Sequence, residues 1–295
     1  MKQNNAAIQE PAEASLMFRL LDGMEISYIV ETAMQNGIPE EHIPLFTRVA
    51  IELRESAEMT AVERICHIFP KLAINTGMPM DQFDRLGSAT LALRSKIPTE
   101  TTTFPFYFGS QIAEMLEMAL VISQSATQFG LSPAQILAFS TSLCSVGLHA
   151  SKNGFHIAVL LDQIQAVCGK SEFSDFSKIA DMPEDTFANL LANDAARAIA
   201  AFIEGVRKLS VIPAKLEDSL RNGGITMPSV TKTLVDASKA GAILTEYFEI
   251  ATQAFEENTE LFKNETNERH PALTVAWQSM QKYIISLIHN IEETF

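Results

Sequence analysis

The chain repeats a pattern in which a glycine is followed by an apolar residue and then, within one or two positions, by a proline. It occurs at Gly37, Gly77 and Gly130, and two apolar residues three or four positions apart follow each time. Glycine readily adopts the left-handed backbone that ends a helix, and the apolar residue packs back on that helix. Proline suits the first turn of the next helix. The pattern therefore predicts antiparallel helical hairpins in the segments 32–46, 73–86 and 125–139.

Weaker copies of this pattern begin at Asp181 and Gly224. The intervals from Gly37 through Gly77, Gly130 and Asp181 to Gly224 are 40, 53, 51 and 43 residues. Such lengths fit pairs of antiparallel helices, as in helical-hairpin arrays, but they are irregular and match no named repeat. Two interpretations of the repeat remain open. The fold is either an ordinary helix bundle in which the same turn chemistry recurs, or a solenoid of duplicated hairpins. A DNA-reading helix-turn-helix is disfavoured, because few basic residues flank the second helices.

Apolar residues recur along the rest of the chain at spacings of three and four, and alternating runs of period two are missing. The sequence thus predicts an all-α fold, a multi-helix bundle of antiparallel helical hairpins that is either compact or solenoid-like. Ser132-Pro-Ala-Gln135 has the form of a capping box that starts a helix. The longer helices are expected at about 15–36, 60–75, 132–151, 183–209, 228–262 and 272–292.

Composition shifts along the chain suggest four parts. Residues 1–14 are polar and contain proline, so we expect a disordered N-terminal tail. Residues 15–96 should form the N-terminal hairpins. Residues 97–106, rich in Thr and Pro, should form a linker to a larger helical domain over 107–295.

No residue with a formal charge occurs from Met118 to Ser151, which is long enough to cross a bilayer. However, Gly130, Ser132 and Pro133 interrupt the stretch, and its second half is rich in Ser, Thr, Ala and Gln. We therefore expect a buried core helix with small residues at Ala134, Ala138 and Ser142. The alternatives are a helix buried by a partner chain and a membrane-spanning segment.

The balance of charge limits the partners of the chain. Its 22 Lys and Arg residues against 36 Asp and Glu residues give a net charge of −14, so a phosphate backbone should be repelled. The three cysteines, Cys66, Cys144 and Cys168, lie far apart and include no CxxC pair. Their use is typical of a reducing compartment, so we expect a cytoplasmic protein.

Few residues suggest chemistry. The chain has no phosphate-binding glycine loop and no nucleophile elbow, so no cofactor or catalytic residue is assigned. Glu63 and His67 are four residues apart on one helix face, but a metal site would need two further donors, and none is assigned. Cys144 and His149 are close in sequence, but burial in an uncharged helix should raise the pKa of the thiol. These two pairs are the candidates for an alternative function, a helical-bundle enzyme or small-ligand-binding protein.

Other features favour an interaction role. Phe104, Phe106, Tyr107 and Phe108 cluster after the predicted linker, either as a staple that docks it on the core or as an anchor for another protein. Methionines at helix joints, such as Met182 and Met227, fill cores or form adaptable binding surfaces. The acidic residues Glu256, Glu257 and Glu260 should form a solvated helix face or attract a basic partner.

In size, acidity and helical periodicity over its whole length, the chain resembles the helical adaptor and chaperone subunits of bacterial secretion machines, including accessory proteins of type IV secretion coupling complexes. The resemblance transfers no residue role, because no diagnostic motif carries it. It implies a non-enzymatic adaptor or scaffold that binds other protein subunits, without nucleic acid and without direct membrane insertion. A homo-oligomer is compatible with this expectation.

Overall fold

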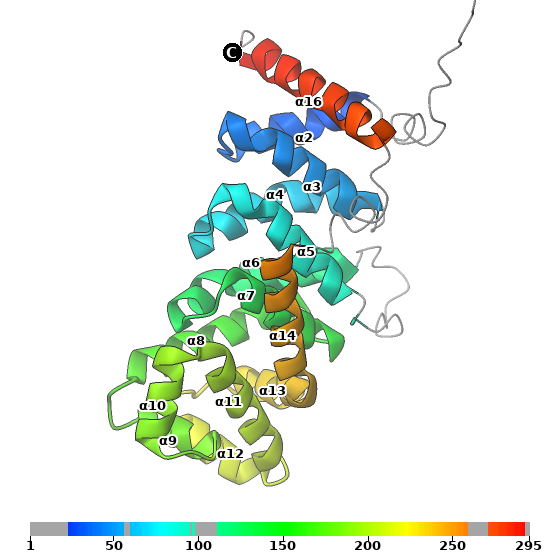
Figure 1. Ribbon diagram of the computed structural model, residues 1–295. Helices are drawn as coiled ribbons and strands as arrows, with labels where there is room; N and C mark the ends of the chain where they lie inside the picture. Colours follow the sequence, from blue (N-terminus) through cyan, green and yellow to red (C-terminus); the bar gives the residue numbers. More distant parts are fainter. Residues whose placement is uncertain (1–22, 56–59, 95, 98–110, 259–270, 293–295) are drawn as a thin grey trace, which may run out of the picture.

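The computed structural model describes residues 23–55, 60–94, 96–97, 111–258 and 271–292. Every regular element in these ranges is a helix and none is a strand, so the prediction of an all-α fold of helical hairpins is confirmed. The predicted tail at residues 1–14 and most of the predicted linker lie outside the described residues. The helices form an elongated stack, with the first and last described helices side by side at one end (Figure 1).

The N-terminal half consists of three hairpins that stack on one another. In the first layer, α2, α4, α6 and α8 each pack on the next, and in the second layer α3, α5 and α7 do the same, which is the arrangement of a solenoid (Figure 1). Short 3-10 helices, η1 and η2, precede α3 and α5, and a π-helical turn, η4, precedes α8. The elements are α2 (Gly23–Gln35), η1 (Glu40–His42), α3 (Ile43–Glu55), α4 (Thr60–Thr76), η2 (Met80–Gln82), α5 (Phe83–Arg94), α6 (Gln111–Phe129), α7 (Pro133–Ser145), η4 (Ala150–Gly154) and α8 (Phe155–Val167).

The predicted glycine turns are present at all three strong sites. Gly37, Gly77 and Gly130 have φ angles of 75°, 66° and 102°, in the left-handed region. At each site the N–H of the following residue donates to a carbonyl five residues earlier, as in Ile38 N to Ala33 O at 3.1 Å. This bond satisfies one of the carbonyls that the end of a helix leaves without a partner. The glycine therefore sets the reversal, and the buried residue after it fixes the hairpin.

The two weaker copies form the same turn, and the structure adds one that was not predicted. Asp181 and Gly224 have φ angles of 58° and 89°, and the next residues, Met182 and Ile225, make the same backbone bond. The additional turn is at Gly147, with a φ angle of 85°. It ends α7 at Ser145, so the helix predicted over 132–151 is too long.

The C-terminal half departs from the regular stack. Two more predicted helices are shorter in the structure, because 183–209 is interrupted at Asp194 and 228–262 contains a 3-10 turn. The short helix α9 was not predicted, and α12 was not among the longer helices predicted. The elements are α9 (Phe173–Ile179), α10 (Glu184–Asn193), α11 (Ala195–Leu209), α12 (Pro213–Asn222), α13 (Pro228–Ala237), η5 (Ser238–Ala240), α14 (Gly241–Glu257) and α16 (Pro271–Glu292).

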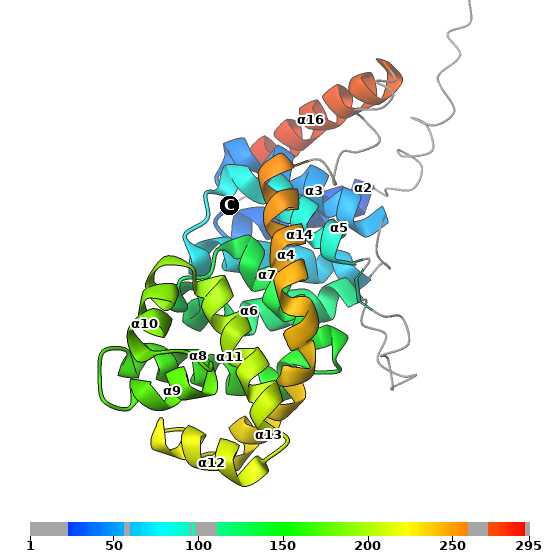
Figure 2. The ribbon, with the colours of Figure 1, turned by 60° about the horizontal axis from the view of Figure 1, so that its bottom comes forward.

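The long helix α14 turns back along the stack and packs on α5 and α7 (Figures 1 and 2). Its buried face includes Leu244, Tyr247 and Phe248. At its end, the Arg85 guanidinium donates to the carbonyls of Phe255 and Glu256 at 3.3 and 3.1 Å. Helix C-termini carry partial negative charge and free carbonyls, so a cation there is favourable. We call this contact the α14 clasp.

The clasp continues through Asn258, the left-handed residue that ends α14. Its side-chain amide donates to Asp84 Oδ2 at 2.6 Å, and its Oδ1 accepts from Ser88 Oγ at 2.9 Å. Both partners lie on α5, which belongs to the second hairpin. The clasp therefore joins residues about 170 positions apart in sequence and fixes the register of α14 on the stack.

The uncharged stretch from Met118 to Ser151 contains the expected buried core helix, α7, whereas residues of α6 such as Val121 and Gln124 are exposed. In α7 the small residues Ala134, Ala138 and Ser142 are buried, and the hydroxyls of this helix donate to carbonyls of its own preceding turn, such as Ser140 Oγ to Ile136 O at 2.8 Å. The capping box predicted at Ser132 and Gln135 is confirmed. None of the helices in the described ranges has the length and apolar character needed to cross a membrane.

Side chains from both sides of residues 97–106 belong to one continuous core, which extends from Ile26 to Ile288. Helix α11 enters this core through Gly205. A Cβ atom there would lie 1.7 Å from the carbonyl oxygen of Ile179, so only glycine allows α11 to approach the end of α9 this closely. This contact positions α11, which borders the surface described next.

Candidate protein-interaction groove

The four aromatic residues predicted as an interaction anchor, Phe104, Phe106, Tyr107 and Phe108, lie outside the described residues. Their role stays a prediction. Apart from Glu260, the other candidate residues from the sequence, and two surface hollows, lie within the described part of the chain.

Glu63 and His67 are both exposed on one face of α4, as their spacing predicts. Within the described part of the chain, no group of three or more His, Cys, Asp or Glu side chains is arranged to hold a metal ion. The pair thus has the solvated position of an ordinary helix surface.

Cys144 and His149 are separated by the turn that ends α7. The Cys144 side chain is buried, and burial together with the nearby Glu114 and Glu117 carboxylates raises the pKa of its thiol. A nucleophilic cysteine needs the opposite shift, because the thiolate is the reactive form. The His149 Nδ1 atom instead lies 3.5 Å from Glu114 Oε1. The structure thus does not give Cys144 the environment of an activated nucleophile.

The acidic residues of α6 join neighbouring elements of the stack. Glu114 Oε1 accepts from the backbone N–H of Ala150 at 2.7 Å, which ties α6 to the π-turn before α8. Glu117 pairs with Arg64 of α4. These contacts give the two carboxylates a structural role between hairpins.

An open hollow lies between α11 and α14, with a contribution from the start of α7. We call it the α11–α14 groove, and its volume is about 700 Å³. Its apolar floor is formed by the buried residues Ala196, Ala200 and Phe248. Its lining consists of Gln135, Asp194, Ala196, Arg197, Ala200, Thr245, Phe248, Glu249, Thr252, Gln253 and Glu256.

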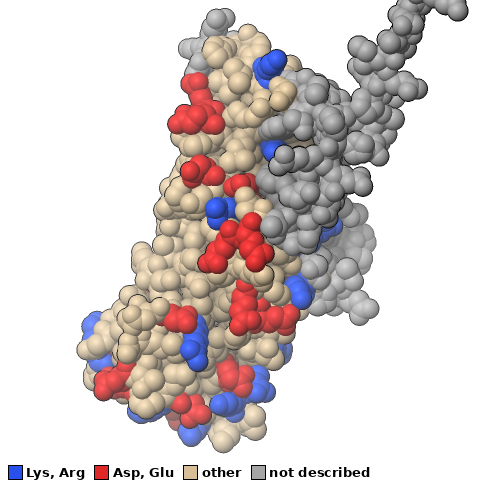
Figure 3. All heavy atoms as spheres, viewed as in Figure 1, with Lys and Arg blue, Asp and Glu red and all other residues tan. Residues whose placement is uncertain are grey.

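The rim of the groove carries three carboxylates and one guanidinium, those of Asp194, Glu249, Glu256 and Arg197. Asp194 caps α11, because its carboxylate accepts from Arg197 N at 3.1 Å. The side chains of Glu249, Glu256 and Arg197 make no ion pair with any residue that the structure describes. Acidic side chains gather over α14 on the face shown in Figure 3. The rim is therefore acidic, with charges that the rest of the described chain leaves unneutralised.

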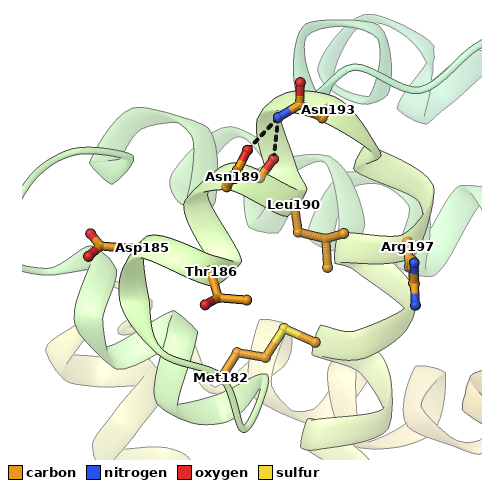
Figure 4. A pocket seen from close by; sticks show the side chains of 7 residues that line it. All are labelled: Met182, Asp185, Thr186, Asn189, Leu190, Asn193 and Arg197. Carbon is orange, nitrogen blue, oxygen red and sulfur yellow. Dashed lines mark hydrogen bonds between the residues drawn. The ribbon is translucent and has the colours of Figure 1, made fainter.

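A second hollow of about 580 Å³ adjoins the groove and shares Arg197 with it. Figure 4 shows Thr186, Leu190 and Met182 directed toward its centre from the α10 side, with Arg197 on the α11 side. Asn193 Nδ2 donates to Asn189 O and Oδ1, at 2.8 and 2.5 Å. We call it the Met182 hollow. It extends the open surface past the junction of α10 and α11.

The sequence indicated part of this surface. Met182 was singled out as a joint methionine and lines a hollow, and Glu256 and Glu257 are exposed at the end of α14 as a predicted acidic face. Arg197 and Phe248 gave no sequence signal, because only the packing of α14 beside α11 brings them together. Glu260 lies outside the described residues.

No family model, characterised protein or solved structure matches this chain in sequence or fold comparisons. The groove itself is therefore the basis of the functional argument.

Proposed function

We propose that this protein is a non-enzymatic adaptor that holds a segment of another protein in the α11–α14 groove. The observation that carries the proposal is a solvent-open groove with an apolar floor and ionic rim residues that have no ion-pair partner in the described chain. Protein interfaces combine an apolar centre with a polar rim in this way. As in the sequence-based expectation, we place the protein in the cytoplasm as an accessory subunit of a multiprotein assembly such as a bacterial secretion machine.

Two properties of the described chain support this proposal over an enzyme or small-ligand binder. The pKa of the Cys144 thiol is raised by its surroundings, which opposes thiol catalysis. The ionic side chains that line the groove are exposed to solvent, whereas small-ligand sites usually enclose most of the ligand around a few polar groups.

A photo-crosslinking amino acid at Thr252, in the groove, tests the proposal in cells of the native host. The matched control carries it at Glu217, an exposed position on α12 outside the lining of the groove. We expect the Thr252 variant to form one major adduct with another protein and the Glu217 variant to form none. Identical adducts at both positions, or no adduct at Thr252, would contradict the proposal.

A further inference from the structure

We infer that the occupant of the α11–α14 groove is a basic amphipathic helix of the partner protein, with two Lys or Arg residues seven positions apart. The inference rests on the proposed function and adds the chemistry of the bound segment. It follows from the spacing of the rim charges, the shape of the floor and the pairing of nearby ions.

Two carboxylates of α14 that line the groove make no ion pair with a described residue, and they define the charge pattern. Glu249 and Glu256 are seven residues apart, which is two helical turns and about 10 Å along the axis. Both are exposed and line the groove. By contrast, Glu246 of the same helix pairs with Lys96 at 3.1 Å and does not line the groove. A helix beside α14 places residues seven apart at the same spacing, so it can pair with both carboxylates.

The floor defines the apolar side of the occupant. Ala196 and Ala200 are one turn apart on α11, and both are small, so a helix can approach closely at this point. Phe248 supplies the aromatic part of the floor from α14. The lining residues of α14 extend from Thr245 to Glu256, or about 17 Å at the rise of an α-helix. This length accommodates about three turns of a bound helix.

Arg197 restricts the charge pattern further. Its guanidinium lies on the α11 side of the groove and makes no ion pair with a described residue. A uniformly basic segment would place a cation against it, and like charges in contact disfavour binding. The occupant should therefore carry its basic residues on the α14 side and an acidic or neutral residue facing Arg197. A nucleic acid does not fit, because its phosphates would meet the carboxylates of the rim.

Fluorescence anisotropy with the full chain tests this inference. The probe is a labelled helical peptide of four turns with Ala and Leu on one face and two Lys residues seven apart, and the control peptide has Glu at both Lys positions. We expect the Lys peptide to bind and the Glu peptide not to bind. We also expect the affinity for the Lys peptide to fall as salt rises from 50 to 500 mM, because the rim charges are exposed to solvent.

Substitutions in the full chain test whether the Lys peptide binds at the carboxylates of the groove. The Glu249→Gln/Glu256→Gln variant should bind the Lys peptide about tenfold more weakly, as expected for the loss of two partly exposed ion pairs. A matched variant, Glu31→Gln/Glu217→Gln, removes two exposed carboxylates on α2 and α12 and should bind like the unmodified chain. The reversed variant Glu249→Lys/Glu256→Lys should bind the Glu peptide in place of the Lys peptide.

Failure of the inference can be separated from failure of the proposed function. Absence of Lys-peptide binding, equal binding of both peptides, or an equal loss in both Gln variants would overturn the inference. If the Thr252 crosslink to a protein still forms in that case, the adaptor function stands with a different occupant. If the crosslink is also absent, the proposed function itself is contradicted.

Discussion

At the scale of single residues, the left-handed helix ends decide where the chain reverses. Five of the six turns with the same backbone bond use glycine, and the sixth uses Asp181, with a φ angle of 58°. An L-residue other than glycine is disfavoured in this region because its Cβ atom crowds the backbone. Asp181 is therefore a strained position in an otherwise regular set.

Substitution of Asp181 by Gly should raise the free energy of unfolding by about 0.5–1 kcal/mol, because it relieves this crowding. The ion pair that is lost, with Lys208 at 3.4 Å, is exposed and contributes little. Chemical denaturation at equilibrium measures the change. The control, Gly77→Ala, places a Cβ atom in open space but in the same backbone region. It should lower stability by about 1 kcal/mol, and a stabilising effect there would refute the argument.

The buried thiols make a prediction about reactivity. Burial raises the pKa of Cys66 to about 12 and also raises the pKa of Cys144, whereas Cys168 is exposed. Iodoacetamide reacts with the thiolate, so at pH 8 the native chain should be alkylated at Cys168 alone and at all three positions in denaturant. Mass spectrometry of the peptides measures this. Rapid labelling of Cys144 in the native chain would contradict its buried, protonated state.

The raised pKa values of Cys66 and Cys144 also predict how the stability of the fold depends on pH. A thiol whose pKa is higher in the folded than in the unfolded state favours folding only while it is protonated. Its contribution is complete below the unfolded pKa of about 8.5 and is lost as the pH rises toward the folded value. Stability should therefore fall between about pH 8.5 and 12, and Cys66→Ser/Cys144→Ser should flatten that part of the profile. Denaturation curves recorded at several pH values measure this profile. An unchanged dependence of the free energy of unfolding on pH in this variant would contradict the assignment.

At the scale of helices, the α14 clasp fixes the position of α14, which forms one side of the groove. Arg85, Asp84 and Ser88 hold the end of this helix through its carbonyls and through Asn258. Each of these bonds is partly buried or exposed, so each contributes modestly, but together they define one position of α14 on α5.

Replacement of Arg85 by Ala should lower the free energy of unfolding by about 1–2 kcal/mol, since two carbonyls lose a charged donor. Hydrogen exchange of the last turn of α14 should accelerate more than that of its first turn. The comparison variant Arg207→Ala removes an exposed arginine that pairs with Glu204 on α11, and it should leave α14 unchanged. Uniform acceleration along α14 in the Arg85 variant would show that the clasp does not fix the helix end.

The sequence predicts helices where their ends carry specific chemistry. The three Gly–apolar–Pro turns and the Ser132 capping box were placed correctly, because glycine backbone freedom and side-chain caps are local properties. The break at Asp194 was missed, since the apolar period continues across it and only the capping bond to Arg197 N marks a new helix. The groove was not predicted as a site, because its residues come from α7, α11 and α14 and meet only through tertiary packing.

At the scale of the whole molecule, the stack of hairpins serves as the support and the α11–α14 groove as the proposed binding surface. The hairpins of the N-terminal half form a two-layer support, and α14 returns along it beside α11 (Figure 2). The Met182 hollow lies beyond the shared residue Arg197 and extends the open surface along α10. We therefore expect the partner to bind a surface made mainly of C-terminal helices, which the N-terminal helices support.

Hydrogen–deuterium exchange of the full chain, alone and with the crosslinked partner or the Lys peptide, tests the central claim most directly. Binding in the groove should slow exchange in residues 194–200 and 245–256 and leave α4 and α12 unchanged. Protection confined to another surface, such as α16 and α2, with no change in residues 194–200 and 245–256, would show that the α11–α14 groove is not where this protein holds its partner.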